Sequence, residues 1–209
     1  MISINEWFVF NSAIDDETCN KLKRHASKKW EVSEVNIRSD ITEEELISGR
    51  KLEDDVDNKN RISDIAWSSE QWVYDLIWPY MVRANEDAGW KYDITSAEST
   101  QITRYKEGGF YNFHRDGSCC HLSKYNDPEN AFFHDKVRKL SMTILLNDSF
   151  EGGQFEFASY SKGNCTVTPL EMKKGQVIVF PSHMEHRVAP VTKGTRYSLV
   201  CWFLGPPFK

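Results

Sequence analysis

The sequence lacks long hydrophobic runs. Within its 209 residues, no stretch approaches the roughly 20 consecutive apolar residues that a transmembrane helix needs. The N-terminal residues MISINEWFVFN also lack the basic start and apolar run of a secretory leader. We therefore expect a soluble, cytoplasmic protein with no membrane partner.

Cysteine and positive charge are scarce as well. The five cysteines are an odd number and include no Cys-x-x-Cys pair, which argues against a disulfide framework and against a zinc site. The formal net charge is −5, so the chain has no basic field to attract the phosphates of a nucleic acid. Nucleic acid is therefore not expected as a partner.

Apolar residues are plentiful enough to form a full core. Hydrophobic residues make up 40% of the chain and aromatic residues 13%, and the length suits one domain over 1–209. Its first part, 1–98, is predicted to combine supporting helices with a polar, acidic and flexible loop over 34–60. Its second part, 99–205, is predicted to hold the functional core.

Two helices are predicted in the first part. Asp15 or Asp16 caps the first helix, whose apolar positions at helical spacing are Ile14, Cys19, Leu22 and Ala26. The second begins near Ser68 and contains Pro79, which is expected to kink or break it. Its inward-facing residues are predicted to be Trp72, Leu76, Tyr80, Met81 and Ala84. Both helices are interpreted as the support of a sheet.

From Trp90 onward, short alternating or apolar runs are separated by Gly, Pro, Asn and Asp. This texture is typical of antiparallel β-structure. The predicted strands are 99–106, 110–115, 139–147, 153–158, 164–168, 176–180, 186–190 and 195–204. The fold class is therefore α+β, mainly β, with a double-sheet jelly roll preceded by supporting helices.

The stretch YKEGGFYNFHRD carries the chemistry. It places His114 and Asp116 two residues apart on the predicted strand 110–115, so both side chains are expected on one face. One imidazole and one carboxylate are two of the three ligands of a 2-His-1-carboxylate facial triad, which binds Fe(II) and leaves positions open. Without a second histidine, the His-x-Asp tripeptide is typical of an ordinary surface strand that carries two polar residues.

The second histidine has to come from the remaining five. His186 begins the predicted strand 186–190, whereas His183 lies in the turn before it. A ligand held on a strand is better positioned, which favours His186. The others are interpreted as a helix boundary residue or as solvated loop residues: His25, His121 and His134.

Arg196 is the candidate for binding an anionic cosubstrate. An iron site that activates dioxygen needs two further electrons, which a chelating 2-oxo acid can supply, and the distal carboxylate of that acid needs a cation. Arg196 lies ten residues after His186 on the next predicted strand, and its planar fork suits a carboxylate. The alternative is a surface charge, but the residues on its strand face, Ser198, Val200 and Trp202, indicate a buried face.

The ordered motifs resemble a known family. They are Y-x-x-G-G-x-Y-x-x-H-x-D, then LSMTILLND, EGGQFEF and GQVIVFP, then H-x-x-x-P-V-x-x-G-x-R with a Trp six residues later. Over 101–204 this order and spacing are similar to those of the prolyl 4-hydroxylase branch of the Fe(II)/2-oxoglutarate-dependent oxygenases. The resemblance implies a double-stranded β-helix of the cupin-like type. Many members of that branch carry Lys where this chain has Arg196, so the motifs indicate the family but do not assign the chain to one branch.

The resemblance also implies roles for individual residues. Iron would be bound by His114, Asp116 and His186, and these three with Arg196 would form the catalytic set. The 2-oxoglutarate carboxylate would be bound by Arg196 and Tyr105. Further positions implied are Ser141 or Thr143 in the cosubstrate pocket, Tyr111 toward the substrate, and Trp202 as a pocket wall.

The activity implied is hydroxylation of a prolyl residue in a protein or peptide, with release of succinate and CO2. It would require Fe(II), 2-oxoglutarate and O2, with ascorbate as the reductant. Two alternatives are an oxygenase of the same scaffold acting on a non-prolyl substrate, such as another side chain, a free amino acid or a small molecule, and a non-catalytic jelly-roll binding module. The segments 34–60 and 117–137 are placed to close over the site, and one or both are expected to grip a polypeptide.

Overall fold

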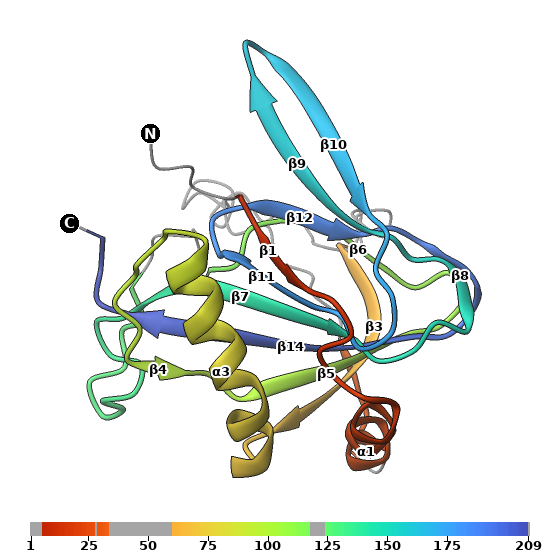
Figure 1. Cartoon of the computed structure of the whole chain (residues 1–209), viewed down its shortest axis with the longest axis horizontal. Helices are drawn as coiled ribbons and strands as arrows, with labels where there is room; N and C mark the ends of the chain where they lie inside the picture. Colours follow the sequence, from red (N-terminus) through yellow and green to blue (C-terminus); the bar gives the residue numbers. More distant parts are fainter. Residues whose placement is uncertain (1–5, 28, 34–59, 118–123, 209) are drawn as a thin grey trace, which may run out of the picture.

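The computed structural model describes residues 6–27, 29–33, 60–117 and 124–208. The chain forms a curled antiparallel sheet with helices against one side (Figure 1), which confirms the mainly β prediction. The elements, in chain order, are β1 (Phe8–Phe10), α1 (Asp16–Ala26), β2 (Glu31–Ser33), β3 (Arg61–Ser68), α3 (Gln71–Asp87), β4 (Ser96–Ala97), β5 (Thr100–Tyr105), β6 (Phe110–His114), β7 (Val137–Leu145), β8 (Phe150–Gly152), β9 (Phe155–Ser161), β10 (Asn164–Leu170), β11 (Val177–Pro181), β12 (Glu185–Val188), β13 (Val191–Gly194) and β14 (Arg196–Gly205).

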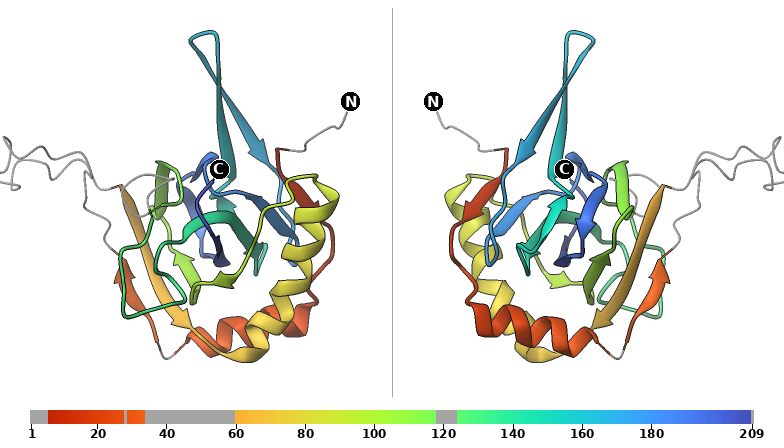
Figure 2. Two further views of the ribbon diagram at one scale, coloured as in Figure 1. Left: turned by 90° about the vertical axis from the view of Figure 1, so that its left-hand side faces the viewer. Right: turned by 90° about the vertical axis from the view of Figure 1, so that its right-hand side faces the viewer.

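The strand order is β1-β11-β7-β14-β5-β3-β6-β12-β9-β10. Strand β3 joins the two halves of this sheet, because Asp64 to Ser68 pair with β5 while Arg61 and Ile62 pair with β6. The sheet therefore folds over at β3, and β5, β7 and β14 face β6, β9 and β12 across an interior. Beyond this body, β9 and β10 continue as a projecting hairpin (Figures 1 and 2).

Side chains alternate along β7 and β14, so one face of each strand packs in the larger apolar core and the other faces the interior of the fold. Leu140, Met142 and Ile144 of β7 pack with the two helices in the larger apolar core. That core includes Leu199, Cys201 and Phe203 of β14. A smaller core inside the fold is formed by Tyr105, Phe155, Phe157, Ile178, Phe180, Val188 and Val191. The residues between the first set, Ser141 and Thr143, face this interior.

Helix α1 begins as predicted. The Asp15 side chain accepts a hydrogen bond of 2.7 Å from the Thr18 N–H, which satisfies one of the free N–H groups of the first turn. The predicted apolar positions are buried: Ile14, Cys19, Leu22 and Ala26.

Helix α3 differs from the prediction in three respects. It begins at Gln71 rather than near Ser68, and it continues through Pro79. Its fully buried residues are Val73, Ile77, Met81 and Ala84, whereas the predicted Trp72, Leu76 and Tyr80 are only partly buried. The prediction of Met81 and Ala84 is confirmed, whereas in the first half of the helix the buried stripe is rotated by one position, to Val73 and Ile77.

All eight strands predicted after Trp90 are present, with shifted ends. Strand β3 was not predicted, because RISDIAWS mixes polar and apolar residues on both faces. A further strand between the predicted strands 186–190 and 195–204, β13, pairs with β8.

Of the two predicted closing segments, 34–60 lies outside the described residues except for residue 60, whereas 117–137 is described except for 118–123. The described residues 124–136 form turns, and the Phe132 carbonyl accepts a hydrogen bond of 2.9 Å from Ser96 Oγ. Across the described parts of the chain, the two helices are too short or too polar to cross a membrane.

Candidate metal and cosubstrate site

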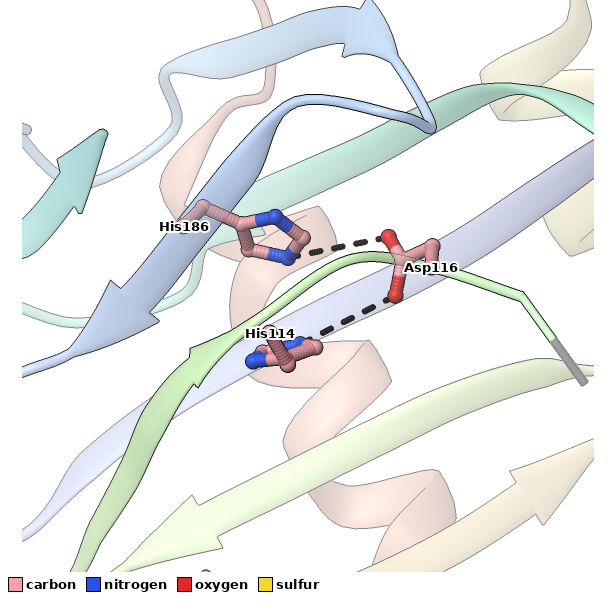
Figure 3. A group of neighbouring side chains, drawn as sticks. All are labelled: His114, Asp116 and His186. Atoms are coloured by element: carbon pink, nitrogen blue, oxygen red, sulfur yellow. Dashed lines mark ion pairs between the residues drawn. The ribbon is translucent and has the colours of Figure 1, made fainter. Parts of the chain in front are cut away.

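The fold brings the three predicted metal ligands together. One ligand atom from each of His114, Asp116 and His186 lies within 4.8 Å of the others. His114 Nε2 is 3.8 Å from Asp116 Oδ1, and His186 Nε2 is 3.6 Å from Asp116 Oδ2 (Figure 3). It is the one such cluster among the residues that the structure describes.

Strand register accounts for the two histidines. His114 is the last residue of β6 and lies opposite His186 of β12 in the antiparallel pair. Their ring centroids are 4.3 Å apart. The competing His183 is exposed in the turn before β12, so the choice of His186 on a strand agrees with the geometry.

The position of Asp116 differs from the one expected from strand alternation. The strand predicted over 110–115 ends at His114 in the structure, and Asp116 lies beyond it in a bend. Two contacts place its carboxylate instead. Its backbone N–H donates to the Ser182 carbonyl at 3.0 Å, and Ser141 Oγ donates to its Oδ2 at 2.6 Å. Strand alternation is therefore not the reason that His114 and Asp116 converge.

Both histidines have the tautomer that a metal requires. His114 Nδ1 lies 2.8 Å from the Asn112 carbonyl, and His186 Nδ1 lies 2.9 Å from the Met184 carbonyl. A carbonyl oxygen only accepts, so each Nδ1 carries the proton and each Nε2 presents a lone pair toward Asp116. Ligands at right angles on one transition metal lie about 3 Å apart, and the observed spacings are slightly wider. The residues present therefore fit a divalent metal such as Fe(II).

The electrostatics of the cluster favour deprotonated ligands. Burial, with the neighbouring His186, lowers the pKa of His114 to about 3, so its Nε2 is unprotonated at neutral pH. Burial alone would raise the pKa of Asp116, but the charges of His186, His114 and Arg138, with the Ser141 hydrogen bond, hold it below its ordinary value. Metal binding needs both of these states.

A cavity of about 220 Å³ opens onto the cluster. It is lined by the three ligands and by four other predicted residues, which are Tyr105, Tyr111, Thr143 and Trp202. The ring of Tyr111 stacks on His114 with centroids 3.5 Å apart. Burial raises the pKa of Tyr111 to about 12, so its hydroxyl remains a hydrogen-bond donor at neutral pH. Ser141 does not line this cavity but lies behind Asp116.

Arg196 is buried just behind the cavity wall. Only 1% of it is exposed, its Nη1 donates to Ser198 Oγ at 3.0 Å, and its guanidinium lies 5.7 Å from the centre of the Tyr105 ring. Burial lowers its pKa to about 10, which leaves it positively charged at neutral pH. Among the described residues no carboxylate pairs with it, as expected of a cation that awaits an anionic ligand.

Apolar rings shield the metal cluster on the side of β9 and β11. Phe155, Phe157 and Phe180 surround the His186 ring, with centroid separations of 5.4, 6.3 and 4.8 Å. These rings exclude water from one side of the cluster, so a ligand has to approach from the cavity.

Arg138 and Arg61 line this cavity and were not predicted as site residues. Arg138 lines it, donates two hydrogen bonds of 2.6 Å to the carboxylate of Glu98, and lies 4.1 Å from the centre of the Trp202 ring. Arg61 lines it from the start of β3. Arg138 could have been considered from the sequence, because it lies two residues before the apolar run that begins at Leu140. The sequence did not indicate Arg61 as a site residue, because β3 itself was not predicted.

Comparison with known proteins places this fold and site in a class. A family model described as the 2OG-Fe(II) oxygenase superfamily matches residues 100–204, half of the chain. Two similar curated relatives are PKHD-type hydroxylases. The one from Xylella fastidiosa is 33% identical over 105 residues, 49% of this chain and 42% of the relative. The one from Stenotrophomonas maltophilia is 32% identical over 105 residues, 49% of this chain and 41% of the relative. These matches span about two fifths of the relatives' length.

Solved structures match over nearly the whole chain. A viral collagen prolyl hydroxylase from Paramecium Bursaria Chlorella virus-1, in a 2OG complex, gives a TM-score of 0.63 at 19% identity, covering 98% of this chain and 99% of that one. A Pseudomonas putida prolyl-4-hydroxylase gives 0.63 at 18% identity, covering 97% and 94%. At this identity the likeness shows the fold, which is the predicted double-stranded β-helix.

The chain belongs to the 2OG-Fe(II) oxygenase superfamily, and its fold is that of prolyl 4-hydroxylases. The family and the His–Asp–His cluster together support Fe(II) and 2-oxoglutarate as metal and cosubstrate.

Proposed function

We propose that this protein catalyses Fe(II)- and 2-oxoglutarate-dependent hydroxylation, with a prolyl residue of a protein or peptide as the substrate. One oxygen atom of O2 enters the substrate as hydroxyl and the other enters succinate, while 2-oxoglutarate loses CO2. The observation that carries the proposal is the cluster of two Nε2 atoms and one carboxylate together with the buried guanidinium of Arg196, which pairs with no carboxylate among the described residues.

Bound iron would supply the redox chemistry that activates dioxygen, with 2-oxoglutarate as the source of electrons and ascorbate as the reductant that maintains Fe(II). The chain's residues hold and orient these groups. His114, Asp116 and His186 bind the metal on one face and leave the cavity side open. Arg196 binds the distal carboxylate of 2-oxoglutarate, because a fully buried cation without an anionic partner is costly.

The neighbouring residues position the cosubstrate and the substrate. Tyr105 supports the same carboxylate with its hydroxyl, and Thr143 lines the space between that carboxylate and the metal. Tyr111, stacked on His114, and Trp202 form the walls that the substrate meets.

A prolyl substrate is supported by two observations. The fold neighbours include prolyl hydroxylases, one of them in complex with a hypoxia inducible factor peptide fragment, and the curated relatives are called PKHD-type hydroxylases. Tyr111 and Trp202 are flat apolar surfaces of the kind that a pyrrolidine ring packs against. An oxygenase acting on a non-prolyl substrate is the second candidate, because the matched relatives share only part of their length with this chain.

The test is succinate formation with Fe(II), 2-oxoglutarate, O2 and ascorbate, with and without proline-containing peptides, reading peptide mass in the same samples. Coupled succinate and a gain of one oxygen on proline are expected. Succinate without peptide oxidation would move the search to other substrates, and no succinate would favour a binding module.

Histidine variants provide the matched control. His186→Ala should abolish metal binding and succinate formation, since it removes one of three ligands. His183→Ala, three residues earlier and outside the cluster, should retain both. If His183→Ala also lost metal binding, the assigned ligand set would be wrong.

A further inference from the structure

Arg61 is a second buried cation at the cavity. It is the first residue of β3, where the two halves of the sheet meet, and only 6% of it is exposed although it lines the cavity. Its polar contacts within the described residues are neutral. Nε donates to Ser63 Oγ at 2.7 Å, and Nη2 donates to Thr103 Oγ1 at 3.4 Å.

The other cavity arginines differ from Arg61 in their partners. Arg138 is neutralised by Glu98 through two hydrogen bonds, and Arg115 lies 3.9 Å from Glu185 at the half-exposed mouth. In the described part of the chain, Arg61 is the cavity-lining arginine without a carboxylate within ion-pair distance. A guanidinium has five N–H donors in a planar fork, so most of those of Arg61 are available to a ligand.

Arg61 lies close to the proposed metal. It is opposite Tyr111 across the β3–β6 pair, and its guanidinium lies 4.8 Å from the centre of the Tyr111 ring. That ring stacks directly on His114. One aromatic ring therefore separates the cation from a metal ligand.

A neutral amide extends this donor surface. Gln101 lines the cavity next to Arg61, and its Nε2 donates to Thr103 Oγ1 at 2.8 Å, the oxygen that also accepts from Arg61. Thr103 is fully buried. The hydroxyl thus holds both side chains side by side in fixed positions, and pre-organised donors bind an anion without an ordering cost.

The two carboxylates of 2-oxoglutarate do not include a partner for Arg61. 2-Oxoglutarate has two carboxylates, of which the proposed function assigns one to the metal and the other to Arg196. Neither is left for Arg61. We propose that Arg61 binds a carboxylate of the substrate itself, so that the substrate is an anionic molecule with its carboxylate near the oxidised carbon. This proposal rests on the proposed function.

The experiment measures binding of matched probes to protein loaded with Mn(II) and 2-oxoglutarate without oxygen. The probes are short peptides with one proline, in pairs that differ only in Glu against Gln at one neighbouring position. Two further pairs are a C-terminal proline as free carboxylate against carboxamide, and free proline against prolinamide. At least one carboxylate probe should bind about tenfold more tightly than its amide, the effect of one charge-assisted pair.

Variants assign that preference to Arg61. Arg61→Gln should bring the two members of the pair to within about twofold, and Arg61→Lys should keep part of the preference because it retains the charge without the fork. Arg83→Gln, on the exposed face of α3, removes the same charge at a distance and should behave as wild type. Mn(II) binding by each variant shows that it is folded.

The outcomes are distinguishable. If no carboxylate probe binds more tightly than its amide, or if Arg61→Gln retains the preference, the proposal is overturned, and Arg61 contacts neutral groups only. If wild-type protein binds neither Mn(II) nor 2-oxoglutarate, the proposed function fails first.

Discussion

Ser141 donates a hydrogen bond of 2.6 Å to Oδ2 of Asp116, and its own oxygen lies 2.9 Å from Ser182 Oγ. Both serines are fully buried. Ser182 also accepts the Asp116 backbone N–H through its carbonyl, so β7 and the turn after β11 fix both the backbone and the carboxylate of a residue that no strand holds. Ser141 is thus a positioning residue for the proposed metal ligand.

Replacing Ser141 should weaken metal binding. Ser141→Ala leaves Oδ2 without its donor, and loss of a hydrogen bond behind a ligand typically costs about 10- to 100-fold in metal affinity. Ser141→Thr keeps the hydroxyl and should restore most of the affinity. Titration with Mn(II), followed by electron paramagnetic resonance, measures this directly. Equal affinity in wild type and Ser141→Ala would show that the backbone hydrogen bond to Ser182 is sufficient to position Asp116.

Replacing Arg196 should affect the cosubstrate rather than the metal. Arg196→Ala removes a charged hydrogen-bond partner worth about 1.5–3 kcal/mol, so the Kd for 2-oxoglutarate should rise about 10- to 100-fold. Arg196→Lys should lose less. Calorimetric titrations of Mn(II) and then of 2-oxoglutarate separate the two affinities, and an equal loss in both would argue against the assigned contact.

Acid stability should depend on Asp64. This carboxylate accepts from Arg104 Nε at 2.8 Å and lies 3.1 Å from Lys106 Nζ. Burial would raise its pKa, but hydrogen bonds from Lys106 and Arg104, with their charges, outweigh this and lower the pKa below 3.8. A lowered folded-state pKa contributes stability above the unfolded pKa, and that contribution is lost as pH falls through the folded value.

The corresponding experiment is urea unfolding of wild type and Asp64→Asn across pH. Near neutral pH the variant should be less stable by about 1 kcal/mol, as for a partly exposed ion pair. The difference should begin to shrink at about pH 4, the ordinary pKa of an unfolded aspartate, and disappear as pH falls through the lower folded-state pKa of Asp64. A difference that stays constant down to about pH 2 would contradict this assignment.

Two glycines with the same backbone conformation should differ in their tolerance of alanine. Gly175 and Gly163 have φ of +79° and +80°. A Cβ at Gly175 would collide with the Ile14 carbonyl, whereas one at Gly163 meets nothing within 4 Å. Gly163→Ala should cost only about 1 kcal/mol for the left-handed conformation, and Gly175→Ala clearly more. Thermal unfolding measures both, and equal costs would mean that the Ala13–Ile14 backbone relaxes freely.

Much of the site could be predicted from sequence because its chemistry is local. Two histidines and an aspartate are the ligand types that Fe(II) prefers, and the short spacing of His114 to Asp116 limits how far apart they can lie. The ten residues from His186 to Arg196 cross through β13 from one half of the sheet to the other, and the shortness of this connection limits how far the cation can lie from the metal ligands. The eight strands after Trp90 were recognisable because turn residues separate apolar runs.

The sequence by itself therefore determined the family, the mainly β fold, and which residues form the metal cluster. Only the tertiary structure decided that Asp116 lies off the strand, that Ser141 lies behind it rather than in the cosubstrate pocket, and that Arg61 faces the cavity. Each of these depends on pairing between strands distant in sequence. Such register is set by packing over the whole sheet, which no short stretch of residues encodes.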